Sequence, residues 1–354
     1  MNEKKKRRVA LLFGGVGAEH EISERSAASC ARALSDACDL LLIGITPSGA
    51  IYLYAGTPDG IGSGTWKNEN ARLFPTSFVR LGEKRGILFQ NTVIPVDVVL
   101  PVLHGDFGED GKIQGWLESV GIPYVGARTL AGAVCQDKAV TKILAQHLSI
   151  PTLPWCTLKS NTAFAEAKLQ ICAVMQKEEY PLILKPTSLG SSIGIATVTD
   201  DLSLRKALSE TGAYGDILVE KYLCGAREVE VCYLGVGGEH YFPAEVYLPD
   251  ADTPYTYDKK YTLNISPVKD GALPDDIQNT LVRYARALVN LLSIRDLCRI
   301  DFFLTDEGKI FFNEINTFPG FGKQSFYPEV CGRNGFDYKT LLLSLCEVAY
   351  ARHL

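Results

Sequence analysis

Two apolar segments in the last quarter of the chain carry polar residues at alternate positions. Arg299 and Asp301 lie in residues 297–304, and Glu314 and Asn316 follow residues 309–313. Residues i and i+2 of a strand face the same side, and the short connection between the segments predicts a hairpin. Two carboxylates, an amide and a guanidinium would then meet, which suits Mg²⁺ and a phosphate. The alternative is an exposed hairpin with solvated charges, but the apolar setting favours partnered charges.

A loop rich in Gly and Ser follows Lys185. Residues 185–194 read Lys-Pro-Thr-Ser-Leu-Gly-Ser-Ser-Ile-Gly between two predicted strands. Backbone N–H groups in such a loop can point at a phosphate, and Lys185 would add a positive charge. The sequence differs from the P-loop, which opens a helix. A flexible hairpin without a ligand is the alternative.

Two further loops follow predicted strands of the first part of the chain. Residues 14–19 contain three glycines and Glu19, and residues 103–111 contain His104. In an open α/β sheet, ligands bind beyond the carboxyl ends of the strands, so these loops predict a small-molecule cleft. The first loop lacks the third glycine of a dinucleotide fingerprint. Helix capping by Glu19 and simple turn formation are the alternatives.

A polar stretch at residues 253–261 contains three tyrosines and two lysines, among them Lys260 and Tyr261. Long irregular loops are often functional lids, although an exposed surface loop would read the same way.

Alternating strands and helices in the first part of the chain predict a parallel sheet. Strands are expected at 9–13, 40–45 and 97–102, and residues 48–85 are expected to form an irregular insertion. The chain is expected to divide into an N-terminal α/β domain (1–126), a central unit (127–216) and a C-terminal unit opened by a strand at 217–222 (217–354).

Composition restricts the class of protein. The chain has 354 residues and a net charge of −5, which disfavours a general nucleic-acid binder. The basic residues near the N-terminus are followed by too short an apolar run for a signal peptide, and no run reaches the ~18 residues of a membrane span. A cytoplasmic protein without a membrane or nucleic-acid partner is expected. The ten scattered cysteines lack a Cys-x-x-Cys pair and are expected to be reduced thiols.

Taken in order, these motifs resemble the D-alanine–D-alanine ligase family of ATP-grasp enzymes, including its D-alanine–D-serine and D-alanine–D-lactate branches. The resemblance runs from about Val9 to Pro328. It rests on these motifs: Phe-Gly-Gly…Glu19-His-Glu-Ile-Ser23, Leu-His104-Gly…Gly-Glu-Asp-Gly-Lys-Ile-Gln-Gly115, Asp137-Lys138, the 185–194 loop, Lys260-Tyr261, Arg299-Ile-Asp301 and Asn-Glu314-Ile-Asn316-Thr-Phe-Pro-Gly320. The implied fold is a three-domain α/β ATP-grasp, with a Rossmann-like N-terminal domain and two α+β subdomains.

The resemblance implies ATP and two Mg²⁺ ions, with Mn²⁺ as a possible substitute. ATP would lie between the second and third domains. Its expected contacts are Lys138, Lys185, Ser192, Glu220, Lys221, Tyr222, Leu223 and Glu228. The metal ligands would be Asp301, Glu314 and Asn316. A first D-alanine would be phosphorylated on its carboxylate, and the amine of a second amino acid would attack the acylphosphate.

The resemblance also implies the residues that handle the amino acids. Arg299 and Gly320 would stabilise the oxyanion, Glu19 would hold the first ammonium, and Ser191 and Tyr261 would join a hydrogen-bonded set. The expected substrate contacts are His104, Lys260, Ser325 and Phe326. A homodimer is what the family suggests.

The pocket for the second substrate departs from the family pattern. Gln324 stands where a histidine is usual, and Phe326 stands where D-alanine enzymes carry Leu or Met and D-serine enzymes often carry Arg. An apolar Phe326 favours D-alanine, although an apolar pocket rejects a hydroxyl only weakly. The long insertion favours D-serine, and Tyr261 disfavours lactate. Another ATP-grasp carboxylate–amine ligase and a nucleotide-binding module without turnover remain the rivals.

Overall fold

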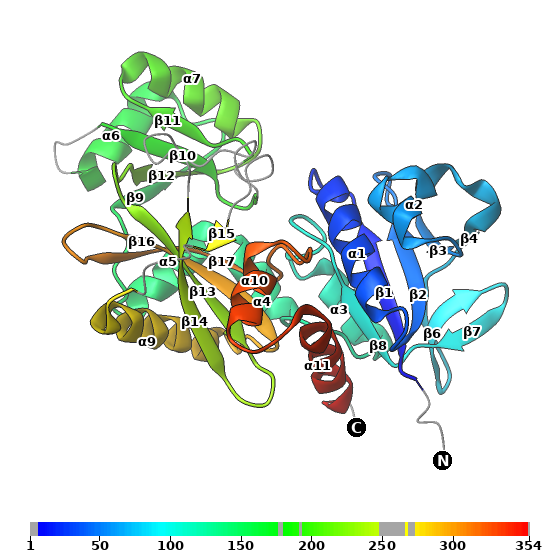
Figure 1. Cartoon of the computed structure of the whole chain (residues 1–354). Coiled ribbons are helices and arrows are strands. Elements are labelled where there is room, and N and C mark those ends of the chain that lie inside the picture. The colour runs from blue at the N-terminus through cyan, green and yellow to red at the C-terminus, as the bar shows by residue number, and fades with distance from the viewer. Residues whose placement is uncertain (1–5, 176–179, 191–192, 248–265, 268–272, 353–354) are drawn as a thin grey trace.

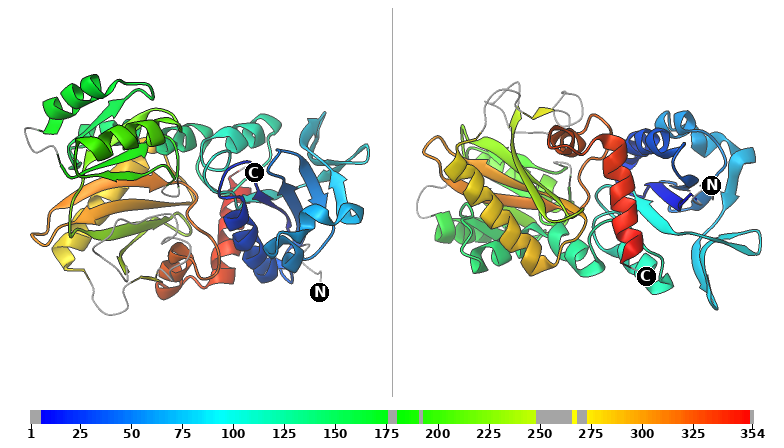
Figure 2. Two further views of the ribbon diagram at one scale, coloured as in Figure 1. Left: turned by 90° about the horizontal axis from the view of Figure 1, so that it is seen from above. Right: turned by 60° about the horizontal axis from the view of Figure 1, so that its bottom comes forward.

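The computed structural model describes residues 6–175, 180–190, 193–247, 266–267 and 273–352. Figure 1 shows an N-terminal lobe joined to two stacked sheets. The C-terminal helices lie between the N-terminal lobe and one of these sheets (Figures 1 and 2).

The N-terminal lobe is built on a five-stranded sheet with the order β4-β3-β2-β1-β8. Its parallel centre is β2-β1-β8, as the buried apolar strands predict. The strands are β1 (Arg8–Gly14), β2 (Asp39–Ile45), β3 (Ile51–Tyr54), β4 (Leu73–Pro75) and β8 (Val98–Pro101). The helices that follow the loops at the carboxyl ends of β1 and β8 are α1 (His20–Leu34) and α3 (Lys112–Val120).

The expectation of an irregular insertion at 48–85 is wrong. This region supplies two strands to the main sheet, and its β5 strand and the start of β6 belong to a separate antiparallel sheet, β5-β6-β7. Its other elements are α2 (Pro58–Gly62), the 3₁₀ turns η1 (Thr65–Asn68) and η2 (Asn70–Arg72) and β5 (Phe78–Leu81). The strands β6 (Lys84–Phe89) and β7 (Thr92–Pro95) complete the small sheet just beyond the region. Short strands between Gly and Pro residues have weak periodicity, which explains the error. Trp66 is fully buried and packs against Phe13, with 5.0 Å between ring centroids.

The central unit is an antiparallel sheet with the order β11-β10-β12-β9. Its elements are β9 (Trp155–Leu158), α6 (Phe164–Met175), β10 (Leu182–Pro186), β11 (Ala196–Val198), α7 (Asp201–Gly212) and β12 (Ile217–Lys221). The strand expected to open the third unit is β12, yet it pairs with β10 and β9. The central sheet therefore extends one strand beyond the boundary expected at 216/217.

The third unit is a sheet with the order β15-β14-β13-β16-β17. Its strands are β13 (Arg227–Leu234), β14 (His240–Tyr247), β15 (Ser266–Pro267), β16 (Leu297–Leu304) and β17 (Ile310–Asn316). Three helices share an apolar cluster with this sheet: α4 (Thr129–Gln136), α5 (Lys138–His147) and α9 (Asp275–Leu292).

The chain then returns to the N-terminal lobe. Helices α10 (Phe326–Arg333) and α11 (Tyr338–Ala351) contribute to one hydrophobic cluster together with β1, β8 and α1. At the same junction, the buried Asp296 carboxylate accepts a hydrogen bond from the Gly126 N–H at 2.8 Å and pairs with Arg352. The loop after β17 lies beside the loop that follows β8, since the Phe318 N–H donates to Glu109 at 3.0 Å.

Candidate active site between the two stacked sheets and the N-terminal lobe

The expected hairpin is present, and its polar residues share a face. Arg299 lies opposite Asn316, and Asp301 opposite Glu314, in the β16–β17 register. Arg299 donates from Nε and Nη2 to the two oxygens of Asp301, each at 2.7 Å, and the Asn316 amide donates to Asp301 at 3.0 Å. Arg299 also pairs with Glu230 on β13 at 3.1 Å. Arg299 is thus held between two carboxylates.

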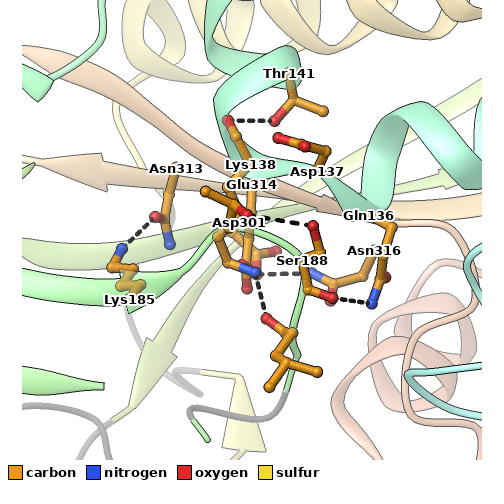
Figure 3. Close-up of polar contacts among 12 residues, drawn as sticks. Gln136, Asp137, Lys138, Thr141, Lys185, Ser188, Asp301, Asn313, Glu314 and Asn316 are labelled. Atoms are coloured by element: carbon orange, nitrogen blue, oxygen red, sulfur yellow. Dashed lines mark hydrogen bonds and ion pairs between the residues drawn. The ribbon is translucent and has the colours of Figure 1, made fainter. Parts of the chain in front are cut away.

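Lys138 joins this hairpin to the Gly/Ser loop. Asp137 caps α5 by accepting from the N–H groups of Ala139 and Val140, which places Lys138 in the first turn. The Lys138 ammonium lies 3.2 Å from Glu314 and donates to the Leu189 carbonyl at 2.6 Å (Figure 3). The loop predicted to cradle a phosphate therefore lies next to a buried lysine and a carboxylate.

Lys185 belongs to a second charged cluster, centred on Glu220. The two Glu220 oxygens pair with Lys142 at 2.6 Å and with Lys185 at 2.9 Å. Lys185 also donates to the Asn313 side-chain oxygen at 3.1 Å. The three charged side chains are 7% exposed or less. One carboxylate between two lysines leaves a surplus positive charge in this cluster, which favours an anionic ligand.

The pKa directions follow from this arrangement. Burial raises the pKa of Glu220, but the two lysines outweigh that effect and lower the pKa to about 2. Burial lowers the pKa of Lys142, and its pairing with Glu220 only partly opposes this. For Lys185, burial also acts to lower the pKa, but Glu220 and more distant carboxylates hold it above the ordinary value.

The donor set on the hairpin fits Mg²⁺ in its chemistry. The residues described contain no group of three or more His, Cys, Asp and Glu side chains that could hold a metal. The predicted set is of another kind, because it combines only two carboxylates, Asp301 and Glu314, with the amide of Asn316 on two paired strands. Magnesium commonly takes one or two protein carboxylates and completes its shell with water and substrate phosphate.

Glu19 lies at the start of α1, where the N-terminal lobe meets the Gly/Ser loop. It is 8% exposed. A Cβ built on Gly105 would meet a Glu19 carboxylate oxygen at 1.9 Å, and one built on Gly190 would meet the same oxygen at 3.6 Å. Because Gly105 has φ +62°, only glycine suits both the backbone and the close approach. The Glu19 carboxylate thus lies between loops of two different domains.

Glu109 ties two of these loops together. Its oxygens accept hydrogen bonds from the backbone N–H groups of Gly105 at 2.9 Å and Phe318 at 3.0 Å. Burial raises the pKa of Glu109 to about 7, and the charge of Glu19 adds to this effect. The carboxyl thereby fixes the 103–111 loop against the segment that leads to Gly320.

His104 lies against the same segment. Its Nδ1 is 3.3 Å from the Phe318 carbonyl oxygen and its Nε2 is 3.4 Å from the Ser26 hydroxyl. The Ser325 hydroxyl lies close to Gly320 and Gly322. A Cβ built on these glycines would be 3.4 Å and 3.2 Å from the hydroxyl oxygen, respectively. His104, Ser325 and Gly320, predicted from separate motifs, therefore occupy one region.

Phe326 begins α10 and is 7% exposed. It belongs to the hydrophobic cluster that includes Phe321 and Tyr327. The structure places its ring in the core that supports Ser325. Its role as a selector of the second substrate stays a prediction.

The remaining predicted nucleotide contacts continue from β12. Lys221 donates from Nζ to the Tyr180 carbonyl at 3.1 Å, and the Tyr222 N–H donates to the Pro181 carbonyl at 3.0 Å. Glu228 lies on β13, opposite Phe303 of β16. Leu223 follows in the connection between β12 and β13. Four predicted residues lie outside the described residues: Ser191, Ser192, Lys260 and Tyr261.

Sequence reasoning missed several residues of the site. Glu230 repeats the alternation of Glu228 in an apolar strand, so that pattern could have revealed it. Lys142 follows Lys138 by one helical turn, which also could have been noticed. Asn313 and Glu109 lay inside motifs that were recognised but were not singled out.

Comparison with known proteins agrees with this geometry. The family described as "D-ala D-ala ligase N-terminus" matches residues 8–127, and "D-ala D-ala ligase C-terminus" matches residues 144–347. A D-alanine–D-alanine ligase of Thermoanaerobacter sp. (strain X514) is 35% identical over 98% of each chain. The Vancomycin C-type resistance protein VanC1 of Enterococcus gallinarum is 34% identical over 97% of this chain and 98% of its own.

Solved structures are similar across the whole chain. The VanG D-Ala:D-Ser ligase from Enterococcus faecalis superposes with a TM-score of 0.85 and 31% identity, covering 98% of this chain and all of its own. The D-alanine–D-alanine ligase from Coxiella burnetii has a TM-score of 0.85 and 28% identity, covering 99% of this chain and 95% of its own. Within the described residues, no helix is long and apolar enough to cross a membrane. Because both family regions match and relatives about 35% identical cover almost the whole chain, this chain belongs to the D-alanine–D-alanine ligase family.

Proposed function

We propose that this chain uses ATP to ligate D-alanine to a second D-amino acid, D-alanine being favoured, and so supplies a dipeptide for peptidoglycan precursors. The main support is the convergence of Lys138, Lys185 and the Asp301–Glu314 pair on one side of a junction whose other side carries Glu19 and His104. The first group suits a nucleoside triphosphate with a divalent metal. The second suits a small zwitterion, which needs a partner for its ammonium and a neutral or positive group near its carboxylate.

The reaction has two steps. An oxygen of the first D-alanine carboxylate attacks the γ-phosphorus of ATP, and the bond to ADP breaks, which gives D-alanyl phosphate. The second amine then attacks the carbonyl carbon, loses a proton, and phosphate leaves as the peptide bond forms. A carboxylate is a poor electrophile, and phosphorylation supplies its leaving group.

The described residues can divide this work. Lys138 and Lys185 neutralise phosphate charge, while Asp301, Glu314 and Asn316 would hold two Mg²⁺ ions, or Mn²⁺ in their place, which when bound spread the negative charge of the transferring phosphoryl group. Arg299 and the backbone N–H of Gly320 stabilise the oxyanion of the second step. Glu19 pairs with the first ammonium. His104 would contact the carboxylate of the first substrate, and Ser325 that of the second.

The remaining assignments stay proposals from the family resemblance. Ser191 and Tyr261 would complete the hydrogen-bonded set at Glu19, Ser192 and Lys260 would contact ATP and substrate, and Glu220 to Leu223 with Glu228 would line the nucleotide base and ribose. The Glu220 side chain is fully occupied by two lysines, so its part would be to hold those lysines. A homodimer working in the cytoplasm is likewise proposed from the family.

D-serine is the second candidate for the amine substrate. The long first-domain insertion favours it, whereas the apolar Phe326 favours D-alanine. Overall similarity does not separate the two, because the VanG D-Ala:D-Ser ligase and the Coxiella burnetii D-alanine–D-alanine ligase have the same TM-score of 0.85. An apolar side chain discriminates against an added hydroxyl by only about a hundredfold. The ratio of the two dipeptides therefore has to be measured directly.

The test is phosphate release with Mg-ATP and D-alanine, with and without equimolar D-serine, with products identified by mass. D-Ala–D-Ala alone would support the favoured function, and predominant D-Ala–D-Ser would place the chain in the D-serine branch. Phosphate release with glutamyl or peptide substrates but not with D-alanine would indicate another ATP-grasp ligase. ATP binding without release under any amino acid would indicate a binding module.

The conservative change Arg299→Lys tests the oxyanion assignment. Lysine keeps the charge, but its single nitrogen cannot replace the bidentate contact with Asp301 and also reach Glu230 and the substrate. We therefore expect kcat to fall about a hundredfold. Phosphate release at saturating substrates measures this. Arg295→Lys is the matched control, since Arg295 donates to the Gly126 carbonyl at the domain junction and should keep wild-type kcat. If both variants kept the wild-type kcat, the assignment of Arg299 to oxyanion stabilisation would be wrong.

A further inference from the structure

A buried carboxylate outside the site described above is held by three donors from two parts of the N-terminal lobe. Glu24 Oε1 lies 2.8 Å from His20 Nε2 and accepts hydrogen bonds from Trp66 Nε1 at 2.6 Å and Lys67 Nζ at 2.8 Å. The Glu24 side chain is 3% exposed and that of His20 is 8% exposed. Burying a charge is costly unless it is paired and hydrogen-bonded, so this cluster is a specific arrangement.

His20 connects the cluster to the glycine turn after β1. Its Nδ1 lies 2.7 Å from the Gly15 carbonyl oxygen and must donate there, because a carbonyl only accepts. Gly14 and Gly15 have φ values of +88° and +105°, and a Cβ on Gly14 would come within 2.2 Å of the Ile45 carbonyl oxygen. The turn is therefore a tight one, and His20 fixes one of its carbonyls.

The same turn determines where Glu19 lies. Glu19 precedes His20 directly, and its carbonyl accepts from the Ser23 N–H at 3.0 Å in the first turn of α1. The Ser23 hydroxyl accepts from the Gly14 N–H at 2.8 Å, which closes the loop onto the helix. Glu24 thus acts on Glu19 through His20, while Trp66 and Lys67 donate to the same Glu24 oxygen, with Lys67 Nζ 3.2 Å from His20 Nε2.

We propose that Glu24 is a positioning residue for the site at Glu19, and that Trp66 and Lys67 of the 48–85 region form part of the same positioning apparatus. The proposal rests on the proposed function, in which Glu19 pairs with the ammonium of the first D-alanine. A carboxylate that holds His20 in place fixes the backbone at Glu19, and a small displacement of such a binding group weakens one substrate selectively. The role of the 48–85 region is then to hold Glu24, and through His20 to fix the backbone at Glu19 in the first amino-acid site.

The test is Glu24→Gln, which keeps the size of the side chain but removes the charge that binds His20 and Lys67. The rate is measured as a function of D-alanine and fitted to two D-alanine sites, and the KM for ATP is measured separately. We expect the KM of the carboxyl-donating D-alanine to rise about tenfold, since a hydrogen bond to a charged group contributes roughly that factor. The KM for ATP and the KM of the second D-alanine should change less than about twofold.

Glu118→Gln is the matched control. Glu118 is a carboxylate of the same lobe that accepts hydrogen bonds from Tyr124, Arg128 and Thr129, and it takes no part in the site. Both variants are expected to lower the thermal unfolding midpoint, but only Glu24→Gln should raise the first KM. Trp66→Phe, which removes only the indole donor, should raise the same KM by a smaller factor.

Two outcomes would overturn the proposal while leaving the proposed function intact. One is a wild-type chain that ligates D-alanine and a Glu24→Gln variant with an unchanged first KM. The other is a parallel rise of all three KM values in both glutamate variants, which would show general destabilisation. A wild-type chain that forms no D-alanyl dipeptide would overturn the proposed function and the role of Glu24 with it.

Discussion

Replacing Glu314 by glutamine is expected to lower kcat for phosphate release by about a thousandfold and to raise the Mg²⁺ concentration needed for half-maximal rate. The change removes one of the two carboxylates on the hairpin face and leaves Lys138, 3.2 Å away, without its charge partner. A neutral amide binds a hard divalent cation much less well than a carboxylate does. A magnesium titration of the rate, at fixed Mg-ATP, measures both effects.

Glu307→Gln is the control for this experiment, because Glu307 lies in the exposed turn of the same hairpin. Its kcat and magnesium dependence should match those of the wild type. Lys138→Met keeps the metal ligand but removes the ion pair and a proposed phosphate contact, so it should lower the rate without the higher magnesium requirement expected for Glu314→Gln. If Glu314→Gln turned over like the wild type with the same magnesium dependence, the metal assignment would be wrong.

The hairpin was predictable because its signal is local. Alternation of Arg299 with Asp301, and of Glu314 with Asn316, defines a face within each strand, and a short turn between the strands fixes their pairing. The sequence could not reveal the register shift between Asp301 and Phe302, which requires the partner strand.

Other features depend on contacts that are distant in the sequence. The strand β12 reads as the opening of a new unit, yet its partners are β10 and β9. The salt bridge between Lys142 and Glu220 joins residues 78 positions apart in α5 and β12, and nothing within either segment predicts that the two side chains pair. Glu24 lies on a helix in which a charged residue normally faces solvent, yet it is buried and pairs with Trp66 and Lys67 of the distant 48–85 region. Family motifs identified the residues near the chemistry, but they gave no information about these supporting contacts.

Removing the charge of Glu220 is expected to be the most destabilising of these substitutions. Glu220→Gln leaves Lys142 and Lys185 buried without the carboxylate that pairs with both, and breaking a buried ion pair on one side costs about 3–5 kcal/mol of unfolding free energy. The KM for ATP should also rise, because Lys185 loses the partner that orients it. Urea unfolding at neutral pH measures the first effect, and steady-state kinetics the second.

The pH dependence of stability gives an independent check on the same residue. The pKa of Glu220 is lowered from 4.5 to about 2 in the folded chain, so ionised Glu220 stabilises the fold above about pH 4.5. That contribution is lost progressively as the pH falls toward 2, since the unfolded chain then binds the proton first. The difference in unfolding free energy between wild type and Glu220→Gln should therefore shrink over this range. A difference that stays constant down to about pH 3 would show that Glu220 is not held ionised by the two lysines.

A double substitution distinguishes loss of charge balance from loss of packing. Lys142→Met fills the same buried space with an apolar side chain, and its former ammonium position lies 5.8 Å from the centre of the Phe312 ring. In the chain carrying both Glu220→Gln and Lys142→Met, one buried lysine remains, as does the Asn313 oxygen that accepts from it. We expect the double variant to be more stable than Glu220→Gln alone by at least about 1 kcal/mol, because the like-charge contact is gone. If the two losses of unfolding free energy simply added, the cluster would contribute through packing. The surplus positive charge would then not explain why Lys185 favours a phosphate.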